Sequence, residues 1–406
     1  MMTMVLGIAV LVVIMLVLTA FVMLARQIMV PSRPATLTVN DTNAIAAQTG
    51  RKLLSILNDN GVLVPSACAG AGTCGLCCVQ VTGNGPPPLP VEIARLSPAE
   101  LRAGMHLACQ VTLRGDMAVR VRDDLLAAEA YDARVASVTT LTPLIREIVL
   151  DLPPGNAAHL FAGAFIQITA PPFALDYSRI AVPDRFAERW VPLRNLSVTT
   201  TEPVTRAYSI ANLPSDTEEG RIVLNIRLAL PPPRASGVPP GIVSSWLFSV
   251  NQGDAISIAG PFGTFRIQDT AREMVFLGGG VGMAPLRAMI FDVLDRQQSR
   301  RKVSFWYGAR SIADLYYVEE LDELAARHDN FRWTVALSDP EPDGGWTGDT
   351  GFIHDIARER YLGDHPAPQD CEYYLCGPPL MIAAVLKMLD DLGVDPANIM
   401  NDDFGV

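Results

Sequence analysis

Four cysteines of this chain have a spacing that could bind iron. Cys68, Cys74 and Cys77 lie in the glycine-rich segment SACAGAGTCGLC, and 31 residues separate this trio from Cys109. Thiolates hold iron–sulfur clusters, and a local trio must wrap one side of the cluster, which requires the tight backbone bends that glycine permits. The spacing therefore predicts that these four cysteines are the ligands of a [2Fe-2S] cluster.

Four cysteines could also bind zinc, form disulfides or pack as small hydrophobic side chains. Zinc sites usually combine two Cys-x2-Cys pairs, and this chain has one such pair, Cys74 with Cys77. Disulfides need an oxidising compartment, and the chain has seven cysteines, an odd number. The cluster is therefore our interpretation, and we interpret Cys78 and Cys371 as packing residues.

The segment RAYS, residues 206–209, resembles the RxYS motif of the ferredoxin-NADP reductase superfamily. An arginine fork suits the flavin pyrophosphate, a tyrosine ring can lie against the isoalloxazine, and a serine hydroxyl can reach N5. GIVSSWL, residues 241–247, looks like the superfamily's second element, a helix start whose amides bind the pyrophosphate. A surface arginine with a core tyrosine, and an ordinary serine-capped helix, are the alternatives. The predicted flavin-binding residues are Arg206, Ala207, Tyr208, Ser209, Gly241, Ser244 and Ser245.

Two further segments are typical of a dinucleotide site. GGGVGMAP, residues 278–285, follows the apolar run MVFL and precedes an expected helix, so its glycines let phosphates approach a strand–helix turn. The superfamily's pattern G-x-G-x-x-P fits from Gly280 to Pro285, whereas a strict G-x-G-x-x-G does not fit. CGPPLM, residues 376–381, ends another expected strand at the same sheet edge. The predicted residues of this site are Gly279, Gly280, Gly282, Met283, Pro285, Cys376, Gly377 and Pro378.

The superfamily resemblance also implies roles for two residues near the C-terminus. The cysteine at the position of Cys376 lies beside the nicotinamide in that superfamily, and a reduced structural cysteine is the alternative. A C-terminal aromatic ring, here Phe404, covers the flavin and swings aside for nicotinamide, with a frayed tail as the alternative. Ser209, Cys376 and Phe404 are thus the predicted catalytic residues, and each is also predicted to contact a cofactor.

Three soluble modules must position these motifs, and the expected fold class is multidomain α+β. Residues 35–128 are typical of a β-grasp [2Fe-2S] ferredoxin-type domain, with TLTVND as a first strand and a helix capped by Ser97 and Glu100. Residues 130–267 alternate strands with turn residues, which predicts an antiparallel β-barrel that binds FAD. Residues 271–406 alternate strands and helices, which predicts an α/β doubly wound domain that binds NADH.

The start of the chain is unlike the rest. Its first 25 residues carry no charged side chain, and about 20 apolar residues already cross a hydrocarbon layer of about 30 Å. Residues 1–27 are predicted to form one transmembrane helix; a cleaved signal peptide is the alternative, although the segment lacks a basic start. Basic residues follow at Arg26 and Arg33, so the positive-inside rule predicts a single-pass protein of the bacterial inner (cytoplasmic) membrane, with its soluble domains on the cytoplasmic side.

Length, composition and charge bound the function. A chain of 406 residues suggests two or three domains, and a hydrophobic content of 49% is ample for their cores. The net charge of −11 argues against a nucleic acid as a partner.

The combination of modules resembles one family among several reductases. Ferredoxin, flavin and NAD modules in this order occur in reductases that feed aromatic-ring dioxygenases and methane monooxygenase, which are soluble and generally show Cys-x4-Cys-x2-Cys spacing. This chain has Cys-x5-Cys-x2-Cys, an apolar N-terminal helix, RAYSIAN, a long insert at residues 171–202 and the ending DDFG. Over essentially its entire length it therefore resembles the F subunits of the bacterial sodium-translocating NADH:quinone oxidoreductases.

That resemblance implies the electron-input step of a sodium-pumping NADH:ubiquinone reductase complex. Hydride would pass from NADH, the substrate, to N5 of FAD, and single electrons would then reach the [2Fe-2S] cluster. The implied partners are other membrane subunits of the complex, the lipid bilayer and, indirectly, ubiquinone. The one apolar helix offers no polar ion path, so sodium transport belongs to the complex. NADH is preferred to NADPH because only Arg310 follows the expected strand KVSFWYGA, without a basic cluster for a 2′-phosphate.

Two other functions are compatible with these motifs. A membrane-tethered NADH reductase component of an oxygenase system would bind the same cofactors, and it would differ by NADH oxidation that is independent of sodium and quinone. A noncatalytic electron-transfer or scaffold protein would bind no flavin.

Overall fold

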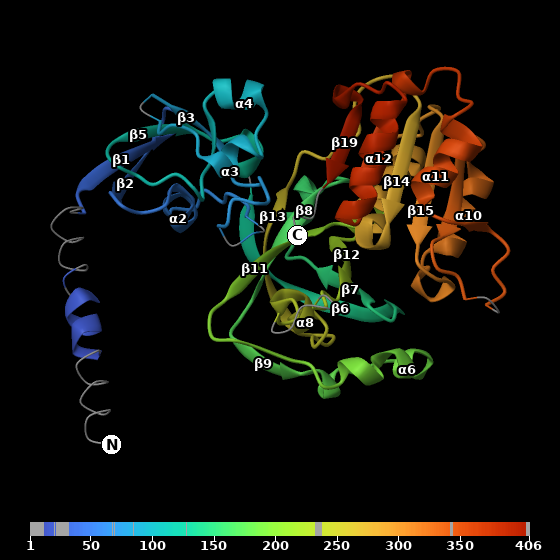
Figure 1. Ribbon diagram of the computed structural model, residues 1–406, viewed down its shortest axis with the longest axis horizontal. Coiled ribbons are helices and arrows are strands. Elements are labelled where there is room, and N and C mark those ends of the chain that lie inside the picture. The colour runs from blue at the N-terminus through green and yellow to red at the C-terminus, as the bar shows by residue number, and fades with distance from the viewer. Residues whose placement is uncertain are drawn as a thin grey trace. The chain divides into compact units, whose positions relative to one another are not determined.

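The computed structural model describes residues 12–19, 21, 32–66, 68, 70–83, 85–126, 128–231, 238–341 and 344–402. The chain divides into two compact units, one of residues 1–64 and 70–127 and the other of residues 65–69 and 128–406 (Figure 1). Phe404, and most of the predicted transmembrane segment, lie outside the described residues.

The first unit contains a five-stranded sheet with the strand order β2-β1-β5-β3-β4. β1 and β5 pair in parallel and the other neighbours pair antiparallel, which is the β-grasp arrangement expected for this part of the chain. The predicted capping box is present, because Ser97 Oγ accepts from the Glu100 amide at 3.2 Å. The elements are β1 (Pro34–Val39), β2 (Asn43–Gln48), α2 (Leu53–Asp59), β3 (Cys78–Thr82), α3 (Pro90–Ile93), α4 (Pro98–Arg102), β4 (Met105–Leu107), β5 (Met117–Arg120) and α5 (Asp123–Leu126).

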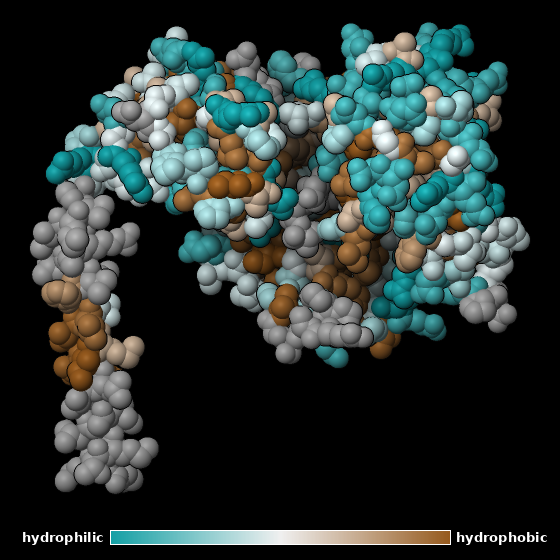
Figure 2. Space-filling view, turned by 45° about the horizontal axis from the view of Figure 1, so that its top comes forward, coloured by the Kyte–Doolittle hydropathy of each residue, from teal (hydrophilic) through white to brown (hydrophobic). Residues whose placement is uncertain are grey.

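Residues 12–19 near the N-terminus are helical and expose apolar side chains, which appear brown in Figure 2. The exposed fractions run from 50% at Val12 to 64% at Leu16, and Phe21 is 67% exposed. Within the described part of the chain, no helix has both the length and the apolar character needed to cross a membrane.

An antiparallel six-stranded sheet opens the second unit, with the strand order β11-β8-β13-β6-β7-β12. The two edge strands meet through an isolated bridge between Ile210 and Leu224, so the sheet curls on itself as the predicted barrel requires. Its apolar interior includes Ile166, Leu224 and Leu247, all fully buried. The elements are β6 (Glu129–Thr142), β7 (Ile145–Asp151), β8 (Phe165–Ala170), β11 (Val204–Ser209), α7 (Pro214–Glu218), β12 (Arg221–Arg227), α8 (Ile242–Leu247) and β13 (Ala255–Phe262).

The long insert noted in the sequence forms a separate flap on this sheet. β9 (Phe173–Asp176) and β10 (Ser197–Thr200) pair antiparallel, and α6 (Ala187–Trp190) lies between them in sequence. Trp190 is buried beside Tyr177 and Phe248, and its indole N–H donates to the Pro143 carbonyl at 2.7 Å. The insert is therefore anchored on the barrel core by aromatic packing.

A parallel six-stranded sheet completes the second unit, with the strand order β17-β16-β15-β14-β18-β19. Alternate residues of β14 enter two different cores: Phe276 packs with α9 and α10, whereas Leu277 packs with α11 and α12. Helices therefore cover both faces, which confirms the doubly wound domain. The elements are β14 (Met274–Gly279), α9 (Met283–Phe291), β15 (Val303–Ala309), α10 (Val318–Arg327), β16 (Phe331–Leu337), β17 (Asp349–Thr350), α11 (Ile353–Ala357), β18 (Glu372–Cys376), α12 (Pro379–Asp391) and β19 (Ile399–Asp402).

One buried polar network joins the curled sheet to the parallel sheet. Arg287 of α9 is 4% exposed, donates to the Ala211 carbonyl and forms an ion pair with Glu320. Its guanidinium carbon also lies 4.2 Å from the ring centre of Tyr317, whose hydroxyl accepts from the Asn225 side-chain amide at 2.8 Å. A buried charge with several partners fixes the two sheets in one arrangement, because losing any partner would leave a polar group unsatisfied.

Candidate functional site

The loop that carries the clustered cysteines depends on glycine. Gly70, Gly72 and Gly75 have φ angles of +86°, +79° and +73°, a region that residues with a Cβ rarely adopt. A Cβ at Gly72 would also lie 3.0 Å from the side chains of Gln110 and Val91. The loop thus needs glycine both for its positive φ angles and for its close packing. A backbone that wraps tightly around a cluster has these two features.

Three cysteines of the first unit, Cys74, Cys77 and Cys109, lie close together at this loop. A side-chain hydrogen bond with Cys109 and then burial raise the pKa of the Cys77 thiol, and the nearby Cys74 adds to the shift. The hydrogen bond with Cys109 and the influence of Cys74 place three of the four predicted ligands close together. Cys68 is half-buried and lies in the short segment that groups with the second unit. Within the first unit, Cys74, Cys77 and Cys109 thus fit the predicted [2Fe-2S] cluster, and Cys68 stays a prediction as its fourth ligand.

Cys78 differs from its neighbour Cys77. Cys78 begins β3 and is half-buried, whereas Cys77 precedes the strand and is fully buried. Burial raises the pKa of the Cys78 thiol to about 11, so it stays protonated at neutral pH. These features support the interpretation of Cys78 as a packing residue.

Glu92 of α3 positions the backbone that leads to the fourth cysteine. Its carboxylate is 1% exposed and accepts from the Leu107 amide at 2.9 Å and the Leu89 amide at 2.7 Å. The same group lies 3.2 Å from His106 Nδ1. The sequence analysis did not identify Glu92, because the sequence of a short helix does not show which of its side chains are buried.

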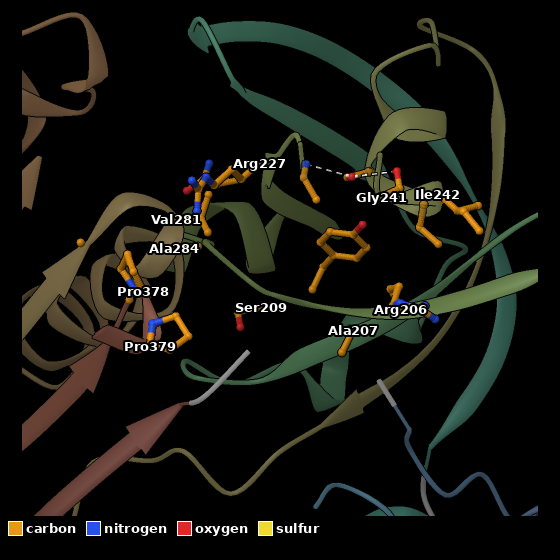
Figure 3. A pocket seen from close by; sticks show the side chains of 17 residues that line it. Arg206, Ala207, Ser209, Arg227, Gly241, Ile242, Val281, Ala284, Pro378 and Pro379 are labelled. Atoms are coloured by element: carbon orange, nitrogen blue, oxygen red, sulfur yellow. Dashed lines mark hydrogen bonds between the residues drawn. The ribbon is translucent and has the colours of Figure 1, made fainter. Parts of the chain in front are cut away.

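A cavity of about 340 Å³ in the second unit collects most of the predicted flavin residues. Figure 3 shows Arg206, Ala207 and Ser209 on β11, with Pro378 and Pro379 approaching from the parallel sheet. Sequence reasoning did not identify Asn225 and Arg227 of β12, which line the same cavity. The lining residues are Arg206, Ala207, Tyr208, Ser209, Asn225, Arg227, Ala229, Gly241, Ile242, Val243, Ser244, Gly279, Val281, Ala284, Gly377, Pro378 and Pro379.

Polar groups around this cavity are suited to a bound cofactor. The buried Oδ1 atom of Asn225 has no hydrogen-bond partner among the described residues, although buried polar atoms are nearly always paired. Burial raises the pKa of Tyr208 above its usual range, an effect that Arg206 partly offsets, so the phenol stays neutral. Ser209 Oγ donates to Asp402 Oδ2 at 2.9 Å. The cavity thus offers a cation, a neutral phenol, an oriented hydroxyl and an unsatisfied acceptor, which fits a flavin.

The two serines predicted to meet the flavin are placed differently. Ser244 lines the cavity, and its hydroxyl accepts from the Ala229 amide at 3.2 Å and donates to the Gly241 carbonyl at 3.1 Å. Ser245 is fully buried, donates to the Gly241 carbonyl at 2.6 Å and lies 2.6 Å from the Tyr177 hydroxyl. Ser245 therefore holds the start of α8 against the insert.

A second cavity, of about 680 Å³, lies at the carboxyl edge of the parallel sheet. After β14 the chain adds β15, β16 and β17 on one side and then returns to place β18 on the other. Ligands of such sheets bind where the strand order reverses, here between β14 and β18. Gly279 ends β14, Gly280 follows it, and Pro378 follows β18; all three line the cavity. Arg227, Gly279 and Pro378 line both cavities, so the two sites adjoin.

Other residues predicted for the dinucleotide site are buried behind the turn between β14 and α9 and do not line the cavity. A Cβ at Gly282 would lie 2.0 Å from the Cys376 carbonyl oxygen, so two backbones touch at this point. Met283 and Pro285 are buried in the first turn of α9. Cys376 is fully buried in the same core, while Gly377 and Pro378 reach the cavities. This packing favours the structural alternative for Cys376.

Cys371 belongs to a polar cluster at the opposite end of β14 and β18. Ligand atoms of Glu273, His365 and Cys371 lie within 4.8 Å of one another. The Ala367 amide donates to His365 Nδ1 at 3.2 Å, so neutral His365 carries its proton on Nε2, which lies 3.3 Å from Glu273. Burial and then Glu273 raise the pKa of the Cys371 thiol to about 12. We interpret the cluster as a hydrogen-bond network, in agreement with the structural role predicted for Cys371.

Three family models match the chain in the predicted order. The 2Fe-2S iron-sulfur cluster binding domain matches residues 37–114, the oxidoreductase FAD-binding domain matches residues 193–267, and the oxidoreductase NAD-binding domain matches residues 276–387. These matches confirm the predicted cofactors and the three cofactor domains.

Known proteins resemble the chain over its whole length. It is 45% identical over 408 residues to the F subunit of the Na(+)-translocating NADH-quinone reductase of Yersinia pestis (strain Pestoides F), with 100% of both chains covered. It is also 45% identical over 406 residues to the protein of the same name from Neisseria gonorrhoeae, again with full coverage. Among solved structures, a cytochrome P450 reductase from Amycolatopsis is similar with a TM-score of 0.62 and 27% identity, covering 91% of this chain and 98% of that chain.

Proposed function

Because the chain belongs to the family of Na(+)-translocating NADH-quinone reductase F subunits, we propose that it is the NADH-oxidising electron-input subunit of a sodium-pumping NADH:ubiquinone reductase complex. The observation that carries the proposal is the match at 45% identity over 100% of both chains. When bound, FAD accepts the hydride of NADH and the [2Fe-2S] cluster accepts single electrons. The protein's own contribution is binding, orientation and electrostatics.

The flavin cavity supplies orientation through β11. Arg206 offers a cation to the pyrophosphate, and the neutral ring of Tyr208 lies along the same cavity. Ser209 donates its hydroxyl hydrogen to Asp402, so its oxygen is free to accept a hydrogen bond from an N–H at flavin N5. Ser244 supports the turn at Gly241 that bounds the cavity. Phe404 remains a prediction for the ring that covers the flavin.

The adjoining cavity supplies the place for NADH. Its shared wall at Gly279 and Pro378 lets the nicotinamide approach the flavin, and the glycines keep side chains out of that space. Arg310 also lines this cavity, and its guanidinium lies 3.1 Å from the carboxylate of Asp339. A carboxylate beside Arg310 disfavours an added 2′-phosphate at that position, which supports NADH over NADPH.

Arg206 is expected to determine flavin retention. Arg206→Ala should weaken FAD binding by about 10- to 100-fold, because hydrogen bonds to charged groups contribute about 1.5–3 kcal/mol. The measurement is the FAD dissociation constant of the purified full chain after flavin removal. Arg221→Ala is the matched control, since Arg221 lies on the same barrel, is 42% exposed and makes surface ion pairs. Equal FAD affinity in both variants would contradict the role of Arg206.

We also infer that residues 1–27 anchor the chain in the inner membrane as a single helix. The support is the uncharged run of 25 residues and the exposed apolar side chains of the described turns. The basic residues that follow, Arg26 and Arg33, favour soluble domains on the cytoplasmic side. The implied partners are the other membrane subunits of the complex, and ubiquinone is reached through them.

An oxygenase reductase remains the alternative function, since the Amycolatopsis cytochrome P450 reductase is similar over 91% of this chain. The test is NADH oxidation by membranes of the native host, compared with membranes in which this gene is deleted. The difference in NADH oxidation rate between these two membrane preparations is the rate that depends on this chain. We expect that rate to require quinone and to rise with sodium. A chain-dependent rate that is indifferent to both sodium and quinone would contradict the proposal and favour the oxygenase role.

A further inference from the structure

Gln110 follows the fourth predicted cluster ligand and reaches back to the cysteine loop. Its side-chain Nε2 lies 3.3 Å from Cys109 Sγ and 2.7 Å from the Gly70 carbonyl oxygen. The backbone carbonyl oxygen of Gln110 accepts a hydrogen bond from Lys52 Nζ at 2.8 Å. The residue is therefore held through both its backbone and its side chain. One side chain therefore touches both the ligand sulfur and the loop that carries the other ligands.

The neighbours determine which end of the Gln110 amide faces the sulfur. The Gly70 carbonyl can only accept a hydrogen bond, so the atom beside it must be the NH₂ group. The same NH₂ group has a second hydrogen, and Cys109 Sγ lies within its reach. Gly72 leaves the room for this arrangement, since a Cβ there would lie 3.0 Å from Gln110 Nε2. The amide is thus a donor to sulfur, locked by the loop.

We propose that Gln110 is a positioning residue that raises the reduction potential of the [2Fe-2S] centre by donating its side-chain N–H to Cys109 Sγ. The inference rests on the cluster assignment and does not depend on NADH or quinone. Reduction adds one electron and forms or breaks no bond, so the added negative charge is shared by the sulfurs. A donor aimed at a ligand sulfur stabilises the reduced form more than the oxidised form.

The test is an EPR-monitored redox titration of the purified full chain with a chemical reductant and mediators. Gln110→Leu should shift the one-electron equilibrium about tenfold toward the oxidised cluster. For a one-electron couple this shift lowers the midpoint potential by about 59 mV. Gln110→Glu, close to the native shape, should shift it at least as far, because a carboxylate replaces the donor. Gln80→Leu is the matched control: Gln80 Nε2 donates to the Ala103 carbonyl at 2.7 Å in the same unit, and its loss should leave the potential unchanged.

A midpoint potential in Gln110→Leu or Gln110→Glu equal to that of the wild type would overturn the inference. If neither variant assembles a cluster, the wild-type protein still decides the matter. Labelling glutamine side chains with ¹⁵N should then give a nitrogen coupling in pulsed EPR of the reduced cluster, and the absence of that coupling would overturn the inference. The predicted shift of the midpoint potential in the Gln110 variants, together with a wild-type chain that does not oxidise NADH, would contradict the proposed function alone.

Discussion

Replacing Cys77 with serine is expected to abolish the [2Fe-2S] centre and quinone reduction while NADH oxidation by an artificial acceptor persists. Cys77 is fully buried and hydrogen-bonds with Cys109, so it lies beside another predicted ligand. Mutating residues that only hydrogen-bond to metal ligands lowers metal affinity or activity by about 10- to 100-fold. Losing a ligand itself should therefore lower quinone reductase activity by more than about 100-fold. The flavin and NADH cavities belong to the other unit, so transfer from NADH to ferricyanide should continue.

Cys78→Ser is the matched control for this prediction. The two cysteines are adjacent, but Cys78 begins β3 and has the features of a packing residue. We expect Cys78→Ser to keep the cluster absorption, the EPR signal and quinone reductase activity close to the wild type. A cluster that survives in Cys77→Ser, or disappears in Cys78→Ser, would contradict the ligand assignment.

Gly282→Ala is expected to distort the NADH site more than a glycine-to-alanine change at any other glycine of that site. The added Cβ would lie 2.0 Å from the Cys376 carbonyl oxygen and 2.9 Å from the Gly377 nitrogen. Gly282 has a φ of −60°, so the conflict is one of space and not of backbone conformation. Both atoms belong to backbone, so no side-chain rotation relieves the contact and the strand–helix turn must move. We expect a loss of at least about 3 kcal/mol of stability.

The measurements are the thermal unfolding temperature and the KM for NADH with an artificial acceptor. The displaced turn carries Gly279 and Gly280, so KM should rise by at least about tenfold. Gly115→Ala is the control, because nothing lies within 4 Å of a Cβ at that position. An unfolding temperature and KM that match those of the control would show that Gly282 does not need to be glycine.

The local motifs could be predicted from the sequence because their chemistry depends on neighbours in the chain. Cysteine spacing, the RAYS segment on β11 and the glycine turn after β14 each combine residues within a few positions, and the structure places each on the expected element. The same holds for the capping box at Ser97. Strand and helix alternation also predicted both sheets of the second unit.

The parts that the sequence did not predict depend on distant contacts. Asn225 and Arg227 reach the flavin cavity because β12 closes the curled sheet against β11, and no local pattern marks them. Met283 and Ser245 belong to motifs but face the core, since a motif does not say which side of its element is buried. Gln110 is adjacent to a ligand, yet its reach to Gly70 depends on the loop conformation. Tertiary packing decides these roles.

We expect this one chain to take electrons from NADH through its flavin to its [2Fe-2S] centre. The most direct measurement is anaerobic addition of NADH to the purified, cofactor-loaded full chain, followed by absorption and EPR spectroscopy. We predict that the flavin absorption bleaches and that the EPR signal of a reduced [2Fe-2S] centre appears in wild type and is missing in Cys77→Ser. Flavin absorption that NADH leaves unchanged, or a bleached flavin with no reduced cluster in the wild type, would contradict the account.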